Sequence, residues 1–399
     1  MHNSRLDQLG DYFFRRLAAL LEPVTPVSDL NPIDLSIGQP LHPTPALLQE
    51  TLSENAHLWH RYPPSLGTPD FRQAVADWLS WRYRLPQHML SPDRHILPVA
   101  GTKEALFMMA QVITPESKHA AKPAILMPNP FYNVYLGGAI VAGAEPVLLP
   151  VTARTHHLPD LDALEQDEAL LARTDAFFLC SPSNPQGSAA DLDYIKRALR
   201  LARSHDFLLI MDECYSEVYG GEPPKGGFEA AAALGGDLDH LLVCNSLSKR
   251  SNAAGLRSGF VAGDPDIIKT FNRLRSYGGA VQPMPVLAAG AALWRDEEHV
   301  RASRALYEQK FDLADSFLSG CFDYDRPDGG FFLWLNVGDS EAITRRLWSE
   351  AALKVVPGAY IGYADDSGWN PGAHAIRVAL VHEKTVTEQA LERLVRTLC

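Results

Sequence analysis

Apolar and polar residues recur along the chain with two periods, one typical of helices and the other of buried strands. Near the N-terminus, one face of a helix is outlined by Leu6, Leu9, Phe13, Leu17 and Leu20. This spacing predicts an amphipathic helix that docks on the body of the protein. A proline-rich passage follows and is expected to be extended.

From about residue 70, amphipathic helices alternate with short apolar runs. Helices are predicted over residues 71–84 and 103–113. The predicted strands are the runs AILMP, PVLLPV, AFFLCSP, FLLIMDE, LLVCNSL and GFVAG. Because these runs have no polar face, they favour a sheet covered by helices on both sides, as in parallel α/β proteins.

The pattern changes after about residue 285, where long helical segments mix with runs such as GGFFLWLNV and AIRVALV. This change indicates a second, smaller α+β domain. We therefore expect three parts: an N-terminal segment, residues 1–40, that packs with the small domain; a large domain, 41–285; and a small domain, 286–399.

The charge composition of the chain limits the kinds of molecule that it is expected to bind. The 399 residues include 48 acidic and 36 basic side chains, for a formal charge of −12. Such a surface argues against nucleic acid or an anionic membrane as the main partner. No apolar run is long enough to span a bilayer, and the N-terminus lacks the apolar core of a signal peptide. We expect a cytoplasmic protein.

The sequence lacks the motifs of disulfide-rich proteins, metal sites, nucleotide-binding loops and serine hydrolases. The five cysteines are dispersed and form no CxxC pair, so we expect neither a disulfide framework nor a zinc site. The histidines are scattered, and no metal site is predicted. The chain contains no GxGxxG, GxxxxGK[ST], GxSxG or HExxH motif.

Polar residues follow three successive predicted strands. Asn184 follows the first, Asp212 and Tyr215 the second, and Ser246 and Lys249 the third. Taken singly, each has an ordinary structural explanation, such as a turn or a helix cap. Because the carboxyl ends of parallel strands meet at one edge of a sheet, we expect these side chains to lie together.

A fourth run, HILPVA, precedes Gly101, Thr102 and Lys103, which open a predicted helix. The first amides of such a helix can bind a phosphate. Lys249 follows a buried strand, where burial disfavours the charged form of a lysine. Such a lysine calls for a chemical explanation.

These residue types together meet the requirements of pyridoxal 5′-phosphate. A lysine amine of lowered pKa can form a Schiff base with an aldehyde. An aspartate facing a pyridine nitrogen keeps it protonated, which makes the ring an electron sink. A tyrosine and an asparagine can bind the ring oxygen, and Arg257, with Ser246 and the helix start, can bind the phosphate.

The chain resembles the fold-type I, class I and II aminotransferase family along nearly its whole length. The motifs that carry the resemblance are SIGQP, RYPPSLGTPDFRQAVADW, GTKEALF, PNPFYNVY, SPSNPQG, MDECYSEVY, SLSKRSNAAGLRSGF and AIRVAL. The resemblance implies a large domain with a mostly parallel seven-stranded sheet, a smaller α+β domain, bound pyridoxal phosphate, and a homodimer with shared active sites.

The resemblance also implies roles for individual residues. Lys249 holds the cofactor and moves a proton between the substrate Cα and cofactor C4′, while Asp212 pairs with the pyridine nitrogen. Tyr215 and Asn184 contact the ring oxygen. The residues implied at the phosphate are Gly101, Thr102, Lys103, Ser246 and Arg257, with Tyr62 reaching it from the partner subunit. Those implied at the substrate are Gly38, Asn184 and Arg377, and Tyr132 or its neighbour Phe131 stacks on the ring.

Two stretches depart from the common family pattern. NPQG replaces the more frequent NPTG, which should matter little because the asparagine makes the contact. SKRSNAAGLRSGFVAGD is similar to the bacterial succinyldiaminopimelate aminotransferases. This similarity implies a ping-pong exchange of an amino group between N-succinyl-LL-2,6-diaminopimelate and 2-oxoglutarate, in lysine biosynthesis. Arg250 either binds an additional substrate carboxylate or has a structural role.

Three alternatives stay open on the sequence. One is a different aminotransferase, acting on aspartate, alanine, aromatic amino acids or unsubstituted diaminopimelate. Another is a fold-type I C–S lyase, which shares the lysine and the aspartate. The third is a non-catalytic regulatory module that binds pyridoxal phosphate.

Overall fold

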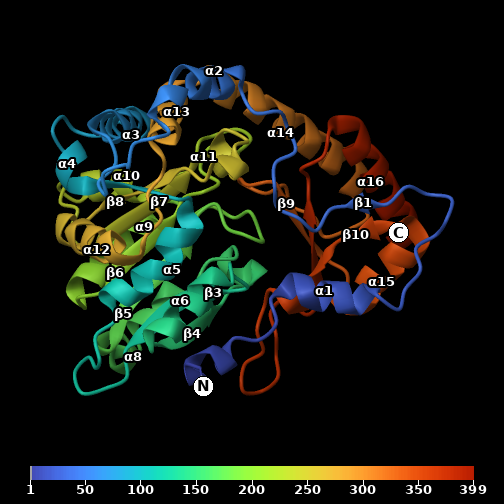
Figure 1. Cartoon of the computed structure of the whole chain (residues 1–399). Coiled ribbons are helices and arrows are strands. Elements are labelled where there is room, and N and C mark those ends of the chain that lie inside the picture. The colour runs from blue at the N-terminus through green and yellow to red at the C-terminus, as the bar shows by residue number, and fades with distance from the viewer. Residues whose placement is uncertain (1) are drawn as a thin grey trace.

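A seven-stranded sheet forms the centre of the larger part of the computed structural model, which describes residues 2–399 (Figure 1). Across the sheet, the strands are β2 (Ile96–Val99), β8 (Gly259–Gly263), β7 (Leu241–Ser246), β6 (Leu208–Asp212), β5 (Thr174–Cys180), β3 (Ala124–Asn129) and β4 (Glu145–Pro150). Neighbouring strands are parallel except at β8, which is antiparallel to both β2 and β7. The predicted α/β fold with a mostly parallel sheet is confirmed.

Helices cover both faces of this sheet. One face lies under α3 (Pro69–Arg82), α9 (Leu192–Ser204), α10 (Gly227–Ala233) and α13 (Met284–Arg295). The other lies under α5 (Thr102–Ile113), α6 (Val134–Ala142) and α12 (Pro265–Gly278). Within residues 2–399, no helix combines the length and apolarity needed to cross a bilayer.

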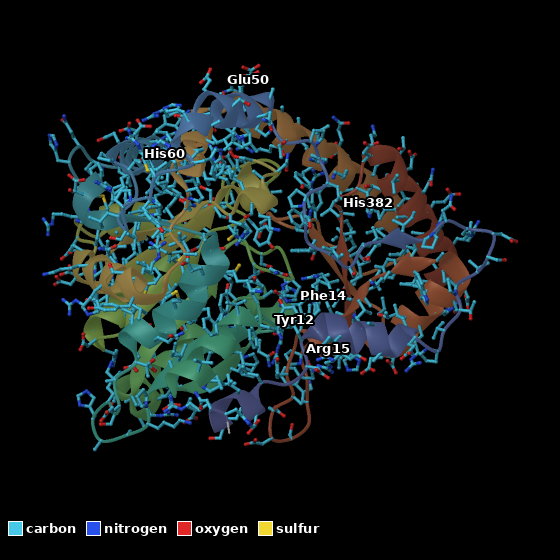
Figure 2. All side chains as sticks on the ribbon, viewed as in Figure 1. Tyr12, Phe14, Arg15, Glu50, His60 and His382 are labelled. Atoms are coloured by element: carbon cyan, nitrogen blue, oxygen red, sulfur yellow. A yellow bond between two sulfur atoms is a disulfide. The ribbon has the colours of Figure 1, made fainter. Side chains whose placement is uncertain are left out.

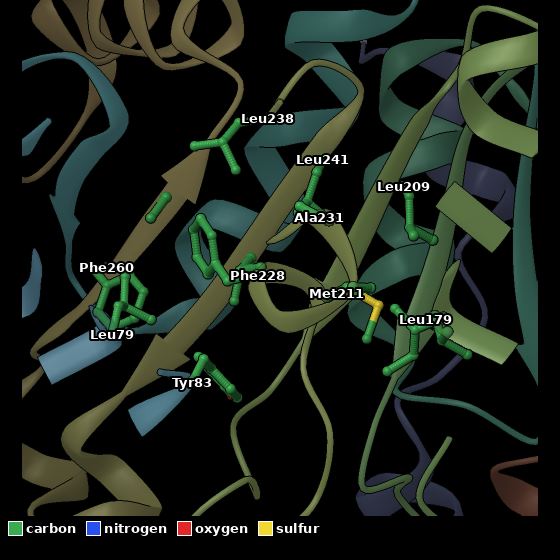
Figure 3. Close-up of a cluster of buried hydrophobic side chains, with 14 of the residues drawn as sticks. Leu79, Tyr83, Leu179, Leu209, Met211, Phe228, Ala231, Leu238, Leu241 and Phe260 are labelled. Atoms are coloured by element: carbon green, nitrogen blue, oxygen red, sulfur yellow. The ribbon is translucent and has the colours of Figure 1, made fainter. Parts of the chain in front are cut away.

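Successive side chains of the central strands enter opposite cores, which explains their uninterrupted apolar runs. Leu209 and Met211 of β6 pack with Phe228 in the first core (Figure 3). Leu208 and Ile210 of the same strand pack in the second core. The uninterrupted apolar runs of the sequence therefore correspond to strands buried on two sides.

The C-terminal part has its own small sheets and core. Its antiparallel sheet has the order β11 (Val356–Pro357), β12 (Ala375–Ala379), β9 (Phe332–Asn336), and β1 (Ile33–Asp34) pairs in parallel with β10 (Leu353–Lys354). Helices α14 (Glu298–Leu318), α15 (Ser340–Ala351) and α16 (Lys384–Leu398) pack around these strands (Figure 1). The expected boundaries at residues 40 and 285 stay predictions.

The N-terminal segment forms two pieces, so the prediction of one continuous helix is wrong. A 3₁₀ turn, η1 (Ser4–Gln8), is separated from helix α1 (Phe13–Leu21), and Leu6 is 45% exposed. Arg5 in η1 donates to the carbonyl of Val141 in α6 at 3.2 Å. Helix α1 buries its apolar face against the C-terminal part. The segment therefore links the two parts of the molecule (Figure 1).

One disulfide is present that the dispersed cysteines did not predict. Cys321, just after α14, is bonded to Cys399 at the end of α16, with their Cα atoms 5.9 Å apart. The two residues are 78 positions apart in the sequence, so only the fold brings them together. Cys180, Cys214 and Cys244 are free and buried.

We expect Cys321→Ser to lower the free energy of unfolding by about 4 kcal/mol, because a disulfide that closes so long a loop restricts the unfolded chain. Thermal melting without reductant measures the loss. Adding reductant should lower the melting temperature of the natural protein to that of the variant, and should leave the variant unchanged. Equal melting of the oxidised and reduced natural protein would contradict this prediction.

Candidate active site

A cavity of about 420 Å³ lies at the carboxyl ends of the central strands and is also lined by residues of the C-terminal part. This volume suits a small organic ligand. Most of the sequence-predicted site residues line it, namely Gly38, Thr102, Lys103, Phe131, Tyr132, Asn184, Asp212, Tyr215, Ser246, Lys249, Arg257 and Arg377. Gly101 directly precedes Thr102 and is not itself a lining residue. Tyr62 is fully exposed and does not reach this cavity in its own chain.

Lys249 projects into the cavity from α11 (Leu247–Arg250), the short helix that directly follows β7. Its ammonium group donates to the backbone carbonyl of Gly38. Burial, together with the positive charges of Arg377 and Arg257, lowers the pKa of Lys249 to about 8. About a tenth of this amine is therefore unprotonated and nucleophilic at pH 7, far more than for an ordinary lysine.

This lowered pKa predicts how the cofactor-free protein captures an aldehyde. Only the neutral amine attacks, so we expect the rate of covalent capture of pyridoxal phosphate to rise with pH and to reach half its maximum near pH 8. An ordinary lysine would give a midpoint above 10. Stopped-flow absorbance between pH 6 and 10 measures the midpoint, and a midpoint above 10 would contradict the prediction.

Asp212 is the last residue of β6 and lines the cavity. Its carboxylate accepts hydrogen bonds from the Tyr135 hydroxyl at 2.7 Å and from the Cys214 amide at 3.3 Å. Burial raises the pKa of Asp212. A cation placed against this carboxylate would restore its charge, and a protonated pyridine nitrogen is such a cation. Tyr135 was not among the residues predicted from the sequence, although it lies one helical turn after Phe131–Tyr132 in PNPFYNVY.

The start of α5 forms a cup for an anion. Gly101 is the N-cap residue and provides no side-chain capping bond, so the first amides of the helix lack an intrahelical partner. Gly101 has φ of +81°, and a Cβ there would collide with the Arg257 guanidinium. Arg257 donates to the carbonyl of Ala100 at 2.7 Å. The helix N-terminus and the guanidinium together suit a phosphate.

Arg377, on β12, is 4% exposed and retains an unused donor. Its guanidinium donates to Asn184 Oδ1 at 3.0 Å and to the Ser36 carbonyl at 2.8 Å. Its buried Nε has no partner. Burial lowers the pKa of Arg377 to about 10. A ligand carboxylate could bind the remaining N–H groups of the guanidinium and compensate the buried charge.

Aromatic rings form the walls of the cavity. Tyr215 lies edge-on to Phe331, with ring centroids 5.4 Å apart, and Lys249 Nζ lies 6.0 Å from the Tyr215 ring centroid. Phe131 stacks on Tyr363 at 5.4 Å. Because Phe131 and Tyr132 both line the cavity, the choice between them as the ring that stacks on the cofactor stays a prediction.

The N-terminal segment also contributes to the cavity. Tyr12, Phe13 and Phe14 line it, and Figure 2 shows Tyr12 and Phe14 where α1 meets the body of the molecule. The place of these residues in the cavity was not predicted. Apolar spacing in a helix indicates packing and cannot distinguish a hydrophobic core from the wall of a ligand cavity.

Of the two roles left open for Arg250, its contacts favour the structural one. It does not line the cavity, and its side chain is 0% exposed. The guanidinium pairs with Glu297 and donates to the Leu293 carbonyl at 2.6 Å. These contacts fix α11 against α13.

The geometry fits pyridoxal 5′-phosphate. The α5 start and Arg257 match its phosphate, Asp212 its pyridine nitrogen, and Lys249 its aldehyde. The fold and this site together define a pyridoxal-phosphate-dependent enzyme of fold type I.

Comparison with known families identifies a narrower class within fold type I. The family model described as aminotransferase class I and II matches residues 31–394. The chain therefore belongs to the class I and II aminotransferases, enzymes that use pyridoxal phosphate.

Individual aminotransferases match this chain over nearly its full length. The LL-diaminopimelate aminotransferase of Moorella thermoacetica is 31% identical, over 99% of this chain and 97% of that protein. The crystal structure of an aminotransferase from Neisseria meningitidis is 39% identical and covers 100% of both chains, with a TM-score of 0.94. The aminotransferase AspB from Helicobacter pylori is 31% identical, over 98% of this chain and 99% of that one, with a TM-score of 0.89.

Proposed function

We propose that this aminotransferase exchanges an amino group between N-succinyl-LL-2,6-diaminopimelate and 2-oxoglutarate. The charge of the cavity lining carries this proposal, together with the similarity of SKRSNAAGLRSGFVAGD to the bacterial succinyldiaminopimelate aminotransferases. Among the lining residues that the structure describes, Lys103, Lys249, Arg257 and Arg377 are cationic, and Asp212 is the single carboxylate. Lys103, Lys249 and Arg257 are assigned to the cofactor, so Arg377 remains for a substrate carboxylate, and the lining offers no free carboxylate for a second substrate ammonium group.

The same imbalance separates the succinylated substrate from free diaminopimelate. The free compound carries a second ammonium group, which needs a carboxylate partner once it leaves water. Asp212 lines the cavity but is already bonded to Tyr135 and is assigned to the cofactor. Succinylation removes that ammonium charge, so the succinylated substrate needs no carboxylate partner at that end.

We further propose the residue roles as follows. Arg377 binds the α-carboxylate, and Gly38, Asn184 and Arg377 form the substrate-binding set. Bound pyridoxal phosphate supplies an electron sink for the electrons left at Cα when its proton departs. Lys249 takes that proton and returns it at cofactor C4′. Asp212 holds the positive charge of the pyridine nitrogen, and Tyr215 donates to the ring oxygen.

A second candidate substrate is unsubstituted LL-diaminopimelate. The supporting observation is that several relatives, including the one from Moorella thermoacetica, are LL-diaminopimelate aminotransferases. These relatives are about 30% identical to this chain, a distance at which substrate preference often differs within a family.

The test is a half-reaction titration of the purified holoenzyme. N-succinyl-LL-diaminopimelate and glutamate should each convert the visible spectrum of the bound cofactor to that of its amino form at lower concentrations than LL-diaminopimelate, aspartate or aromatic amino acids. Conversion at the lowest concentration by LL-diaminopimelate would select the second candidate. Conversion only by the other amino acids would overturn both.

We also propose a homodimer in which Tyr62 reaches the cofactor phosphate of the partner subunit. The resemblance of RYPPSLGTPDFRQAVADW to the family motif supports this proposal, and the full exposure of Tyr62 leaves its hydroxyl free to contact a partner subunit. We expect Tyr62→Ala to weaken retention of pyridoxal phosphate about tenfold, the worth of one charge-assisted hydrogen bond. Equilibrium dialysis measures retention. Exposed Tyr277→Ala is the control, and sedimentation as a monomer would contradict the proposal.

A further inference from the structure

A second, much smaller cavity lies next to the active-site cavity. Its volume is about 10 Å³, close to the least room that holds one water molecule. Phe131, Cys180 and Asn184 line both cavities, so only one layer of side chains separates them. The remaining lining residues include His157, Ser183 and Gln186.

Two nitrogens of these lining residues are buried and have no hydrogen-bond partner. They are Nδ1 of His157 and Nε2 of Gln186. Leaving such groups unpaired is unfavourable, so native proteins almost always provide a partner. The hydroxyl of Ser183 accepts the Ser188 amide at 3.1 Å and still has its own proton to donate.

The donor and acceptor character of these groups matches one water molecule. The Gln186 amide nitrogen donates. Burial lowers the pKa of His157, so the ring is neutral near pH 7 and, with its proton on Nε2, presents Nδ1 as an acceptor. A water molecule can accept from Gln186 and donate to His157, with Ser183 as a third partner, and buried water typically makes about three hydrogen bonds.

We propose that this cavity holds a structural water that joins His157 to Gln186, and that the two residues thereby position Asn184. Asn184 lies two residues before Gln186 in the same loop and uses its Oδ1 to accept from Arg377 at 3.0 Å. Its amide nitrogen is left to donate to the cofactor ring oxygen. This role of Asn184 rests on the proposed function, whereas the water does not.

The proposal revises the expectation that glutamine in NPQG matters little. A threonine side chain at position 186 would be shorter and would lack the amide N–H group that reaches the cavity. Gln186 is 6% exposed, so its amide group is held inside the protein and is available for the bridge. His157 comes from the loop after η3 (Ala153–Thr155), remote in sequence from SPSNPQG.

The first test is a crystal structure of the natural holoenzyme at a resolution that reveals ordered water. We expect a water within hydrogen-bond distance of both His157 Nδ1 and Gln186 Nε2. An empty cavity, or a direct bond between the two side chains, would overturn the proposal. This test involves no amino-acid substrate, so it can fail or succeed independently of the substrate assignment.

The second test is a double-mutant cycle with Gln186→Leu, His157→Leu and both together. If the water holds Asn184, each single change should weaken binding of pyridoxal phosphate about threefold to tenfold. Each should also raise the pH midpoint of the holoenzyme's visible spectrum, because a weaker donor to the ring oxygen stabilises the deprotonated form less. The double variant should show no larger effect than either single change.

The matched control is His156→Leu. His156 and His157 have similar backbone conformations, with φ of 50° and 54°, so leucine introduces the same backbone strain at either position. His156 does not line the cavity and should leave both quantities unchanged. Additive effects of the two single changes, or an unmoved spectral midpoint beside an ordered water, would overturn the positioning role.

Discussion

Replacing Lys249 with alanine is expected to reduce turnover about 10⁴-fold, the largest effect of any single substitution in this protein. The substitution removes both the covalent anchor of the cofactor and the base that moves the proton. The fold should persist, because the side chain makes one hydrogen bond, to the Gly38 carbonyl, and burying its amine is unfavourable. Steady-state rates and thermal melting measure the two properties separately.

The control for this substitution is Lys269→Ala, which removes an exposed lysine of α12. It should leave turnover unchanged. A small primary amine added to the Lys249→Ala variant should restore part of the rate, because it can enter the vacated space and accept the same proton. A variant that turns over at the natural rate without added amine would contradict the assignment of Lys249.

Arg377→Leu is expected to lower kcat/KM about 100-fold or more, equivalent to about 3 kcal/mol. The loss should be similar for the amino donor and for the 2-oxo acid, because both bring an α-carboxylate to the same guanidinium. It should be much smaller for amines that lack a carboxylate. Comparison of kcat/KM across these three kinds of substrate distinguishes lost recognition from general damage.

Arg345→Leu, at an exposed position of α15, is the matched control and should leave all three values unchanged. Asn184 and Ser36 lose a donor when Arg377 is replaced, so some loss of stability is also expected. A melting curve of the Arg377→Leu holoenzyme separates this effect from the loss of binding. Equal losses for amines with and without a carboxylate would contradict the proposed role.

The parts of the fold that depend on local pattern could be predicted from the sequence. Strands β3, β5, β6 and β7 each contain an uninterrupted apolar run because helices cover both faces of the sheet. Asp212 and Lys249 stand at or just beyond strand ends, so the parallel topology alone brings them to one edge.

Features that depend on contacts distant in sequence could not be predicted in this way. Leu6 and Leu9 continue the helical spacing of α1, yet η1 turns away to bind α6, because Arg5 finds a carbonyl partner there. Arg250 is adjacent to Lys249 in the sequence, but neighbouring residues of a helix point in different directions, so one side chain enters the cavity and the other enters the core. The bridge between Cys321 and Cys399 likewise requires the packing of α14 and α16.

The pairing of β2 with β8 bears on how the protein is made in the cell. Gly101 follows β2 and Arg257 precedes β8, so the anion cup forms only after Gly259–Gly263 has joined Ile96–Val99. A nascent chain leaves the ribosome from its N-terminus and lacks Arg257 for much of its synthesis. Until then the outer edge of β7 is also unpaired, and open edges of this kind invite aggregation and attract chaperones. Loading with the cofactor must therefore wait until residue 263 has left the exit tunnel.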